Sequence, residues 1–96
     1  MSVAVEFKFR LYVAGGALNS VQAVVKLASL CQTHLPDYHE IEIIDVFRDP
    51  GRALADGVFM APTLVKLAPS PIRRLVGTLS QTQAVLQTCG LEFGTL

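Results

Sequence analysis

The side chains of this chain that could do chemistry begin with two cysteines. Cys31 and Cys89 lie far apart in the sequence and form no CxxC motif. A disulfide between them would require Cα atoms within about 7 Å of each other. Because unpaired cysteine is among the most buried residue types, we expect both thiols to pack as small hydrophobic groups.

The two histidines could bind a metal ion, but their surroundings do not favour this. His34 and His39 flank Pro36, and no cysteine or carboxylate lies near them at the spacing of a zinc site. We therefore expect both imidazoles in solvent-exposed loops and predict no metal site.

Gly15 and Gly16 raise the possibility of a phosphate-binding loop. Neither a GxGxxG nor a GxxxxGK[ST] sequence follows them, and both fingerprints need more matching positions than two glycines supply. A plain turn is the stronger interpretation, and no cofactor is predicted. Because no Ser/His/Asp group or carboxylate pair stands in a recognisable motif either, we predict no catalytic residue and no enzyme activity.

Composition limits the class of protein. Ninety-six residues are enough for one small domain, and eight basic against eight acidic side chains give a net charge of zero. Such a balance favours neither nucleic acid nor an anionic membrane as a partner. The amino terminus has no signal-peptide pattern and no apolar stretch reaches membrane-spanning length. We expect a soluble, cytoplasmic protein.

The first half of the sequence predicts a strand, a helix and a second strand. Residues 5–13 alternate between apolar and mostly polar side chains, which is typical of a strand. Asn19 and Ser20 suit a helix N-cap, and the helix should end before Pro36. Residues 41–46 predict the second strand, parallel to the first. The helix face expected to be buried comprises Val21, Val24, Val25, Ala28 and Cys31, widened by Leu27 and Leu30.

The second half predicts a short helix, a hairpin and a last helix. Asp49 can cap a helix over residues 51–55, with Pro50 at its first position and Asp56-Gly57 at its end. Pro62 should open a third strand, with Ala61-Pro62 a candidate cis peptide. A Pro-rich loop and residues 72–76 complete an antiparallel hairpin. Ser80 and Gln83 form a capping box for a helix over residues 81–89, with Gly90 as its C-cap.

Together these elements predict an α/β domain with the order β-α-β-α-β-β-α. The four strands should form one mixed sheet in the order 2-1-3-4 with helices on both faces, which is the thioredoxin-like plan. That plan fixes no function. A thioredoxin-type oxidoreductase needs a reactive cysteine pair at the start of its first helix, and residues 15–20 contain no cysteine.

A more specific resemblance lies in several short blocks of the sequence. They are Leu11-Tyr12-Val13-Ala14-Gly15, Asn19-Ser20, Ile44-Asp45-Val46, Pro50, Ala61-Pro62-Thr63-Leu64, Pro69, Pro71-Ile72-Arg73-Arg74, Gly77 and Leu79-Ser80. In these blocks the chain resembles the KaiB family of bacterial circadian-clock components. It is also similar to the KaiB-like sensory domain of the clock's histidine kinase, although the Val-Ala-Gly and Asn-Ser positions favour KaiB.

The resemblance implies a binding module without catalysis. Members of the family dock on the hexameric ATPase KaiC, displace the kinase's sensory domain and capture KaiA. The residues expected to contact partners are Asp45, Phe47, Arg73 and Arg74. The alternative function is a thioredoxin-like thiol or chaperone-type protein unrelated to a clock, acting through Cys31 or Cys89.

The resemblance also implies two folds for one sequence. One is a tetrameric ground state with the order βαββααβ, and the other is a monomeric thioredoxin-like state that binds partners; the two differ after about Asp49. Because its capping box, C-cap and hairpin loop agree with the thioredoxin-like state, we expect that state to be the stable one here.

This chain departs from the family pattern at several charged positions. Gln22 and Glu42 stand where the family carries basic residues on the first helix and second strand, so one charge is lost and one is reversed. The last helix carries Gln81 and Thr82 where the family is charged, and the acidic tail is absent. Charge complementarity toward a partner is therefore expected to differ from the family's usual pattern.

Overall fold

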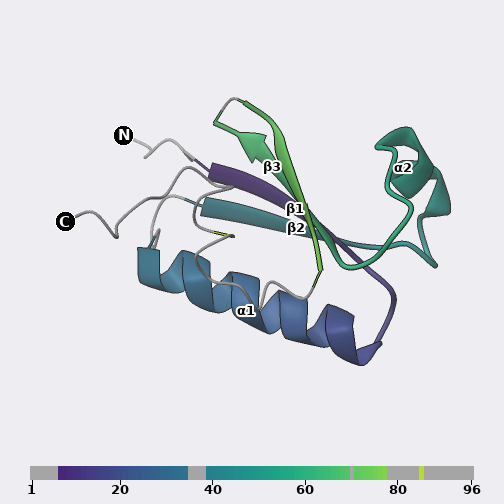
Figure 1. The fold of residues 1–96 in the computed structure, drawn as a ribbon, viewed down its shortest axis with the longest axis horizontal. Coiled ribbons are helices and arrows are strands. Elements are labelled where there is room, and N and C mark those ends of the chain that lie inside the picture. Colours follow the sequence, from purple (N-terminus) through teal and green to yellow (C-terminus); the bar gives the residue numbers. More distant parts are fainter. Residues whose placement is uncertain (1–6, 35–38, 70, 78–84, 86–96) are drawn as a thin grey trace.

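The computed structural model describes residues 7–34, 39–69, 71–77 and 85. Six elements follow one another along the chain: β1 (Phe7–Val13), α1 (Leu18–His34), β2 (His39–Asp45), α2 (Pro50–Ala55), β3 (Thr63–Ala68) and β4 (Arg73–Val76). The strands form one sheet in the order β2-β1-β3-β4 (Figure 1). This is the strand order that the sequence predicts.

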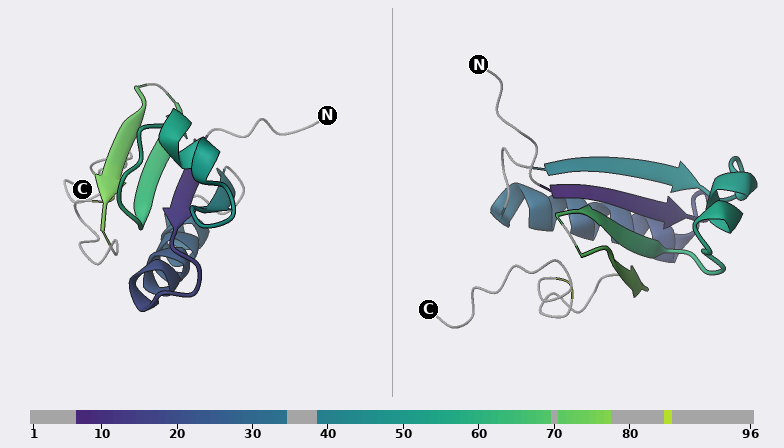
Figure 2. Two further views of the ribbon diagram at one scale, coloured as in Figure 1. Left: turned by 90° about the vertical axis from the view of Figure 1, so that its right-hand side faces the viewer. Right: turned by 90° about the horizontal axis from the view of Figure 1, so that it is seen from above.

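The first three elements, β1, α1 and β2, form the predicted parallel βαβ unit. β1 and β2 pair in parallel, from Phe7 opposite His39 to Val13 opposite Asp45. Because parallel neighbours cannot be joined by a tight turn, the long helix α1 makes the crossover. The carboxyl ends of both strands therefore meet at one end of the sheet, beside α2 (Figure 2).

The predicted hairpin is also present. β3 pairs antiparallel with β1 on one side and with β4 on the other. β3 begins at Thr63, so Pro62 immediately precedes the strand and is not its first residue. The Ala61–Pro62 and Ala68–Pro69 peptide bonds are both cis.

The start of α1 differs from the prediction that Asn19 and Ser20 form the N-cap. The helix begins at Leu18, and the carbonyl of Ala17 accepts the first helical hydrogen bond, from the Val21 N–H. Ser20 is buried inside the first turn, where its hydroxyl accepts a hydrogen bond of 2.8 Å from the Ala14 N–H. The polar side chain thus fastens the preceding turn instead of capping the helix.

The buried face of α1 was only partly predicted. Its buried residues are Ser20, Ala23, Leu27 and Cys31, whereas Val21, Val25 and Ala28 are exposed. Because valines occur on several sides of this helix, the sequence is compatible with two overlapping apolar faces, and only one of them is buried. The face that contains the small residues Ser20 and Ala23 packs on the sheet.

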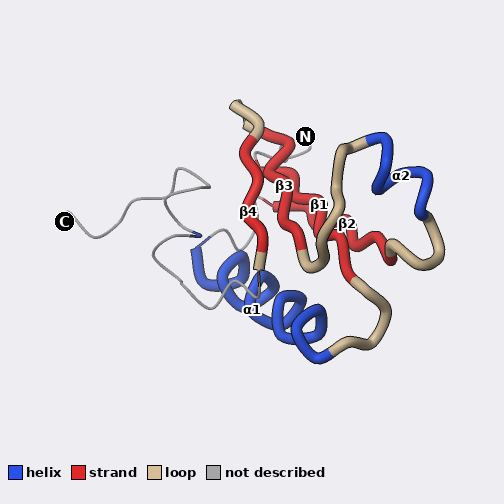
Figure 3. The backbone as a smooth tube through the Cα atoms, turned by 45° about the vertical axis from the view of Figure 1, so that its right-hand side comes forward, coloured by secondary structure: helices blue, strands red, loops and turns tan. Residues whose placement is uncertain are grey.

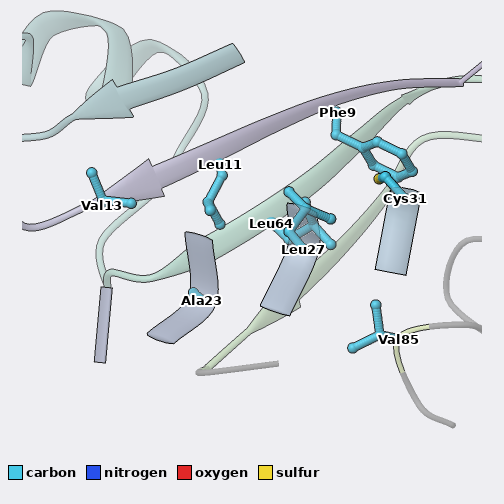
Figure 4. Close-up of a cluster of buried hydrophobic side chains, with 8 residues drawn as sticks. All are labelled: Phe9, Leu11, Val13, Ala23, Leu27, Cys31, Leu64 and Val85. Carbon is cyan, nitrogen blue, oxygen red and sulfur yellow. The ribbon is translucent and has the colours of Figure 1, made fainter. Parts of the chain in front are cut away.

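One hydrophobic cluster lies between α1 and the sheet (Figure 4). It comprises Phe9, Leu11, Val13, Ala23, Leu27, Cys31, Leu64 and Val85. Cys31 is 2% exposed and lies beside Phe9, which confirms the expected burial of this thiol. Cys89 lies outside the described residues.

A second, smaller cluster lies on the opposite face of the sheet, under α2. It comprises Tyr12, Ile44, Ala53, Val58 and Val65. Helices therefore cover both faces, as predicted, but α2 covers only the end of its face where β1 and β2 end (Figures 2 and 3).

The short helix α2 begins and ends close to the predicted residues. Pro50 is at its start, and Gly57, with φ +68°, follows its end in a conformation that suits glycine. Asp49 differs from the prediction, since its side chain makes no capping hydrogen bond and only its carbonyl accepts, from Arg52 and Ala53.

The histidine prediction was wrong in its placement. His34 is the last residue of α1, and His39 is the first residue of β2, so neither is a loop residue. The second strand accordingly spans His39–Asp45 and not residues 41–46. The predicted capping box and last helix lie outside the described residues, apart from the buried Val85.

Candidate partner-binding surface

Large apolar side chains are exposed around α2, at the end of the sheet. Phe47 is 74% exposed, Leu54 67%, Phe59 84% and Met60 65%. Phe47 follows β2, Leu54 belongs to α2, and the other two lie in the segment between α2 and β3. We call these four residues the apolar surface. Exposed apolar groups clustered in one region are typical of interaction sites, in contrast to isolated ones.

A hollow of about 440 Å³ lies beside the apolar surface. Its lining is Ala14, Val46, Pro50, Ala53, Leu54, Val58, Phe59, Met60 and Ala61. None of these side chains is titratable or nucleophilic, so the hollow offers shape and apolar contact but no acid, base or nucleophile. It suits an apolar side chain of a partner.

Asp45, at the end of β2, holds the two turns that border the apolar surface. One carboxylate oxygen accepts hydrogen bonds from the N–H groups of Gly15, at 3.3 Å, and of Phe47, at 2.9 Å. The carboxylate therefore ties the turn before α1 to the turn after β2. Of the predicted contact residues, Asp45 thus supports the surface while Phe47 is part of it.

Gly15 provides a test of this turn. It has φ +54°, and a Cβ added there would lie 3.5 Å from the Phe47 ring. The contact is ordinary, but the left-handed backbone costs a non-glycine residue about 1 kcal/mol. We expect Gly15→Ala to lower the free energy of unfolding by about 1 kcal/mol in urea denaturation, whereas Gly16→Ala, with open space around its Cβ, should change it little. Equal effects would contradict this account.

The two predicted arginines lie on different faces of the hairpin. Arg74 donates hydrogen bonds to the carbonyl oxygens of Asp56 and of Gly57, the latter at 3.3 Å. It therefore binds the end of α2, where a cation is favoured. Arg73 is exposed and pairs across the sheet with Lys66. Because neighbours along a strand point to opposite faces, Arg73 lies away from α2.

A network of charged groups fixes α2 to the sheet. The Arg10 guanidinium donates to Glu42 and to Asp56, each at 2.9 Å, and Arg52 donates to the other oxygen of Glu42 at 3.0 Å. The Tyr12 hydroxyl donates to the Asp56 carboxylate and lies 3.3 Å from the Arg52 carbonyl oxygen. We call Arg10, Tyr12, Glu42, Arg52, Asp56 and Arg74 the α2 clamp.

The pKa values of the clamp follow from these contacts. Hydrogen bonds from Tyr12 and Arg10 lower the pKa of Asp56, and hydrogen bonds from Arg10 and Arg52 lower that of Glu42. Burial and the Asp56 carboxylate raise the pKa of Tyr12. Both carboxylates are therefore held ionised and Tyr12 protonated at neutral pH.

The described cysteine lies apart from the apolar surface. Cys31 is enclosed in the α1 cluster, and a thiol in apolar surroundings is a poor nucleophile. Among the described residues no three His, Cys, Asp or Glu side chains gather as metal ligands. Within the same residues, no helix has the length and apolar character needed to cross a bilayer.

Of the four residues in the apolar surface, Phe47 was among the contact residues predicted from the sequence, and Leu54, Phe59 and Met60 were not. The available signal was Phe59-Met60, two large apolar residues in a short connection where turn residues are usual. Sequence reasoning also missed the α2 clamp, because Arg10 lies 32 residues from Glu42 and 46 from Asp56. Only the strand register and the return of α2 over the sheet bring these groups together.

Comparisons with known proteins agree on one family. The KaiB domain model matches residues 10–91. The circadian clock protein KaiB3 of Synechocystis is 40% identical over 77 residues, which cover 80% of this chain and 76% of the relative. The circadian clock oscillator protein KaiB of Synechococcus elongatus is 35% identical over 96 residues, covering all of this chain and 94% of the relative.

Solved structures show the same architecture at low identity. The N-terminal domain of Synechococcus elongatus SasA superposes with a TM-score of 0.73 at 18% identity, covering 98% of this chain and 92% of the domain. Thioredoxin of Fasciola hepatica also gives 0.73, at 17% identity, covering 93% and 84%. The fold is therefore thioredoxin-like, as the sequence predicts, and the chain belongs to the KaiB family.

Proposed function

We propose that this chain is a non-catalytic docking module that binds a KaiC-like ATPase and thereby regulates a circadian or clock-derived system. The observation that carries the proposal is the family match over residues 10–91. Its relatives are named as circadian clock proteins. We propose that the whole chain acts as one domain in the thioredoxin-like, monomeric state.

The apolar surface is the proposed docking site. Interfaces depend on a few large side chains that become fully desolvated in a pocket, and Phe59 and Met60 supply such side chains beside a hollow of about 440 Å³. Phe47 extends the surface across the turn that Asp45 holds. The lining of this hollow is apolar, which suits the desolvation of an apolar side chain of the partner.

Arg73 is proposed as a second, weaker contact outside the apolar surface. Its side chain is exposed on the edge strand β4, where a carboxylate of a partner could approach. Arg74 belongs to the α2 clamp because it donates hydrogen bonds at the end of α2. We propose that it supports binding indirectly, by holding α2. We further propose that a KaiA-like protein is captured and that the clock histidine kinase competes for the same ATPase.

The proposal is tested by binding to a purified KaiC-like ATPase. The chain is immobilised and titrated with the ATPase in the presence of ATP and, separately, of ADP. A saturable complex is expected in at least one nucleotide state, with Arg73→Ala weakening it by about two- to fivefold. Failure of the wild-type chain to bind any KaiC-like ATPase in either state would contradict the proposal.

The thiol-dependent alternative makes a different prediction. Because Cys31 is 2% exposed, Cys31→Ala should lower the free energy of unfolding by about 1 kcal/mol and leave ATPase affinity within twofold of wild type. A Cys31→Ser/Cys89→Ser variant should likewise keep its binding. Loss of binding in variants that remain folded by circular dichroism would favour the thiol-dependent alternative.

A further inference from the structure

The helix α2 is too short to be stable in isolation. It has six residues, and Ala53 is its only buried one. Isolated helices shorter than about 12 residues are marginal in water, so contacts with the rest of the chain must fix α2. The apolar part of these contacts is the small cluster that Ala53 joins with Val58.

The α2 clamp supplies the remaining contacts, and its charges alternate. Arg52, Glu42, Arg10 and Asp56 form a continuous chain of cation, anion, cation and anion. Each of the two middle groups therefore has two opposite charges as neighbours. Networks of this kind stabilise more than isolated surface ion pairs do.

The clamp contacts one side of α2 and leaves the apolar surface open. Asp56 is the C-cap of α2 and lies one turn after Arg52, so both side chains project from the side of α2 that faces the sheet. Leu54, between them in sequence, is 67% exposed and lines the hollow. The polar face thus anchors α2 while the other side shapes the docking site.

We infer that the α2 clamp residues are positioning residues for partner binding. They set the affinity of the apolar surface by holding α2 and the segment after it in place, without themselves contacting the partner. This inference rests on the proposed function. Glu42 stands where the family carries a basic residue on this strand. The inference gives Glu42 the role of holding α2 through Arg10 and Arg52.

The charges predict how the clamp responds to pH. Asp56 faces Arg10 and Tyr12 from β1 and Arg74 from β4, and Glu42 faces Arg10 and Arg52. Because both carboxylates have lowered pKa values in the folded state, their contribution is complete above their unfolded values. It is lost as the pH falls through the lowered values, so the hold on α2 is constant at neutral pH.

Hydrogen exchange tests the clamp without a partner. The N–H groups of Asp56, Gly57 and Val58 donate to carbonyls of α2, so their protection reports how firmly α2 is held. We expect Glu42→Gln to speed their exchange by about threefold to tenfold at neutral pH. Arg52→Lys, which keeps the charge, should speed it less than Arg52→Leu. Amides of β1 should not change.

ATPase affinity is then measured for the same variants. We expect Glu42→Gln to weaken binding by a similar factor, and 0.5 M NaCl to weaken wild type more than the variant because salt screens the clamp. The matched control is Arg48→Leu, an exposed arginine in the turn before α2, which should leave α2 protection unchanged.

Two results would overturn the inference. One is unchanged exchange in α2 for both Glu42→Gln and Asp56→Asn. The other is faster exchange with unchanged ATPase affinity. If the wild-type chain binds no ATPase, the proposed function fails, and with it the partner half of the inference; exchange alone then decides whether the clamp holds α2.

Discussion

Replacing Phe59 by aspartate is expected to lower the affinity for a KaiC-like ATPase by about thirtyfold or more. Phe59 is 84% exposed and lines the hollow beside α2, so a partner would have to desolvate it on binding. Truncating an aromatic residue at the centre of an interface commonly costs about 2 kcal/mol or more. An aspartate there also places an unpaired charge in the interface. Isothermal titration calorimetry measures the change.

The matched control for Phe59→Asp is Val25→Asp. Val25 is 64% exposed on α1, far from the apolar surface, and the substitution introduces the same charge. We expect its affinity to stay within about twofold of wild type, and the thermal midpoint of both variants to stay close to that of wild type. Equal loss of affinity in the two variants would contradict the placement of the docking site.

Leu11→Ala is expected to lower the free energy of unfolding by about 3 kcal/mol. Leu11 is fully buried in the central strand β1, where it pairs with Ile43 on one side and Leu64 on the other. Truncating such a leucine removes apolar contacts and leaves a cavity, which together cost about 2–5 kcal/mol. Urea denaturation followed by circular dichroism gives the difference.

Val25→Ala provides the comparison for Leu11→Ala. It also removes methyl groups, but from an exposed position, so its effect should be within about 0.5 kcal/mol. A domain of this size has a stability of about 5–15 kcal/mol, so the Leu11 effect should shift the transition clearly. A loss below about 1 kcal/mol would mean that the core is not centred on β1.

The fold was predictable from the sequence because its signals are local. Alternation along β1, proline near both ends of β3 and the Asp56-Gly57 stop of α2 each act over a few residues. The strand order then follows from the crossover by α1 and from the hairpin. Local signals were insufficient for α1, because its sequence allows two apolar faces. The predicted buried face included Val21 and Val25, which are exposed in the structure.

The candidate site was less predictable because it is assembled from distant segments. Asp45 and Arg74 lie in the family blocks, but their roles as supports depend on contacts across the fold. From the sequence, Glu42 was interpreted as a reversal of charge that alters complementarity toward a partner. The structure instead places it between Arg10 and Arg52, a role that no sequence spacing indicates.

The most direct test of the central claim is to map the contact on the chain itself. The ¹⁵N-labelled chain is titrated with unlabelled KaiC-like ATPase, and the loss of amide signals is followed by NMR. We expect signals of residues 46–61 to weaken first and those of the exposed face of α1 to weaken least. Signal loss confined to α1, or none at saturating ATPase, would contradict docking through the apolar surface.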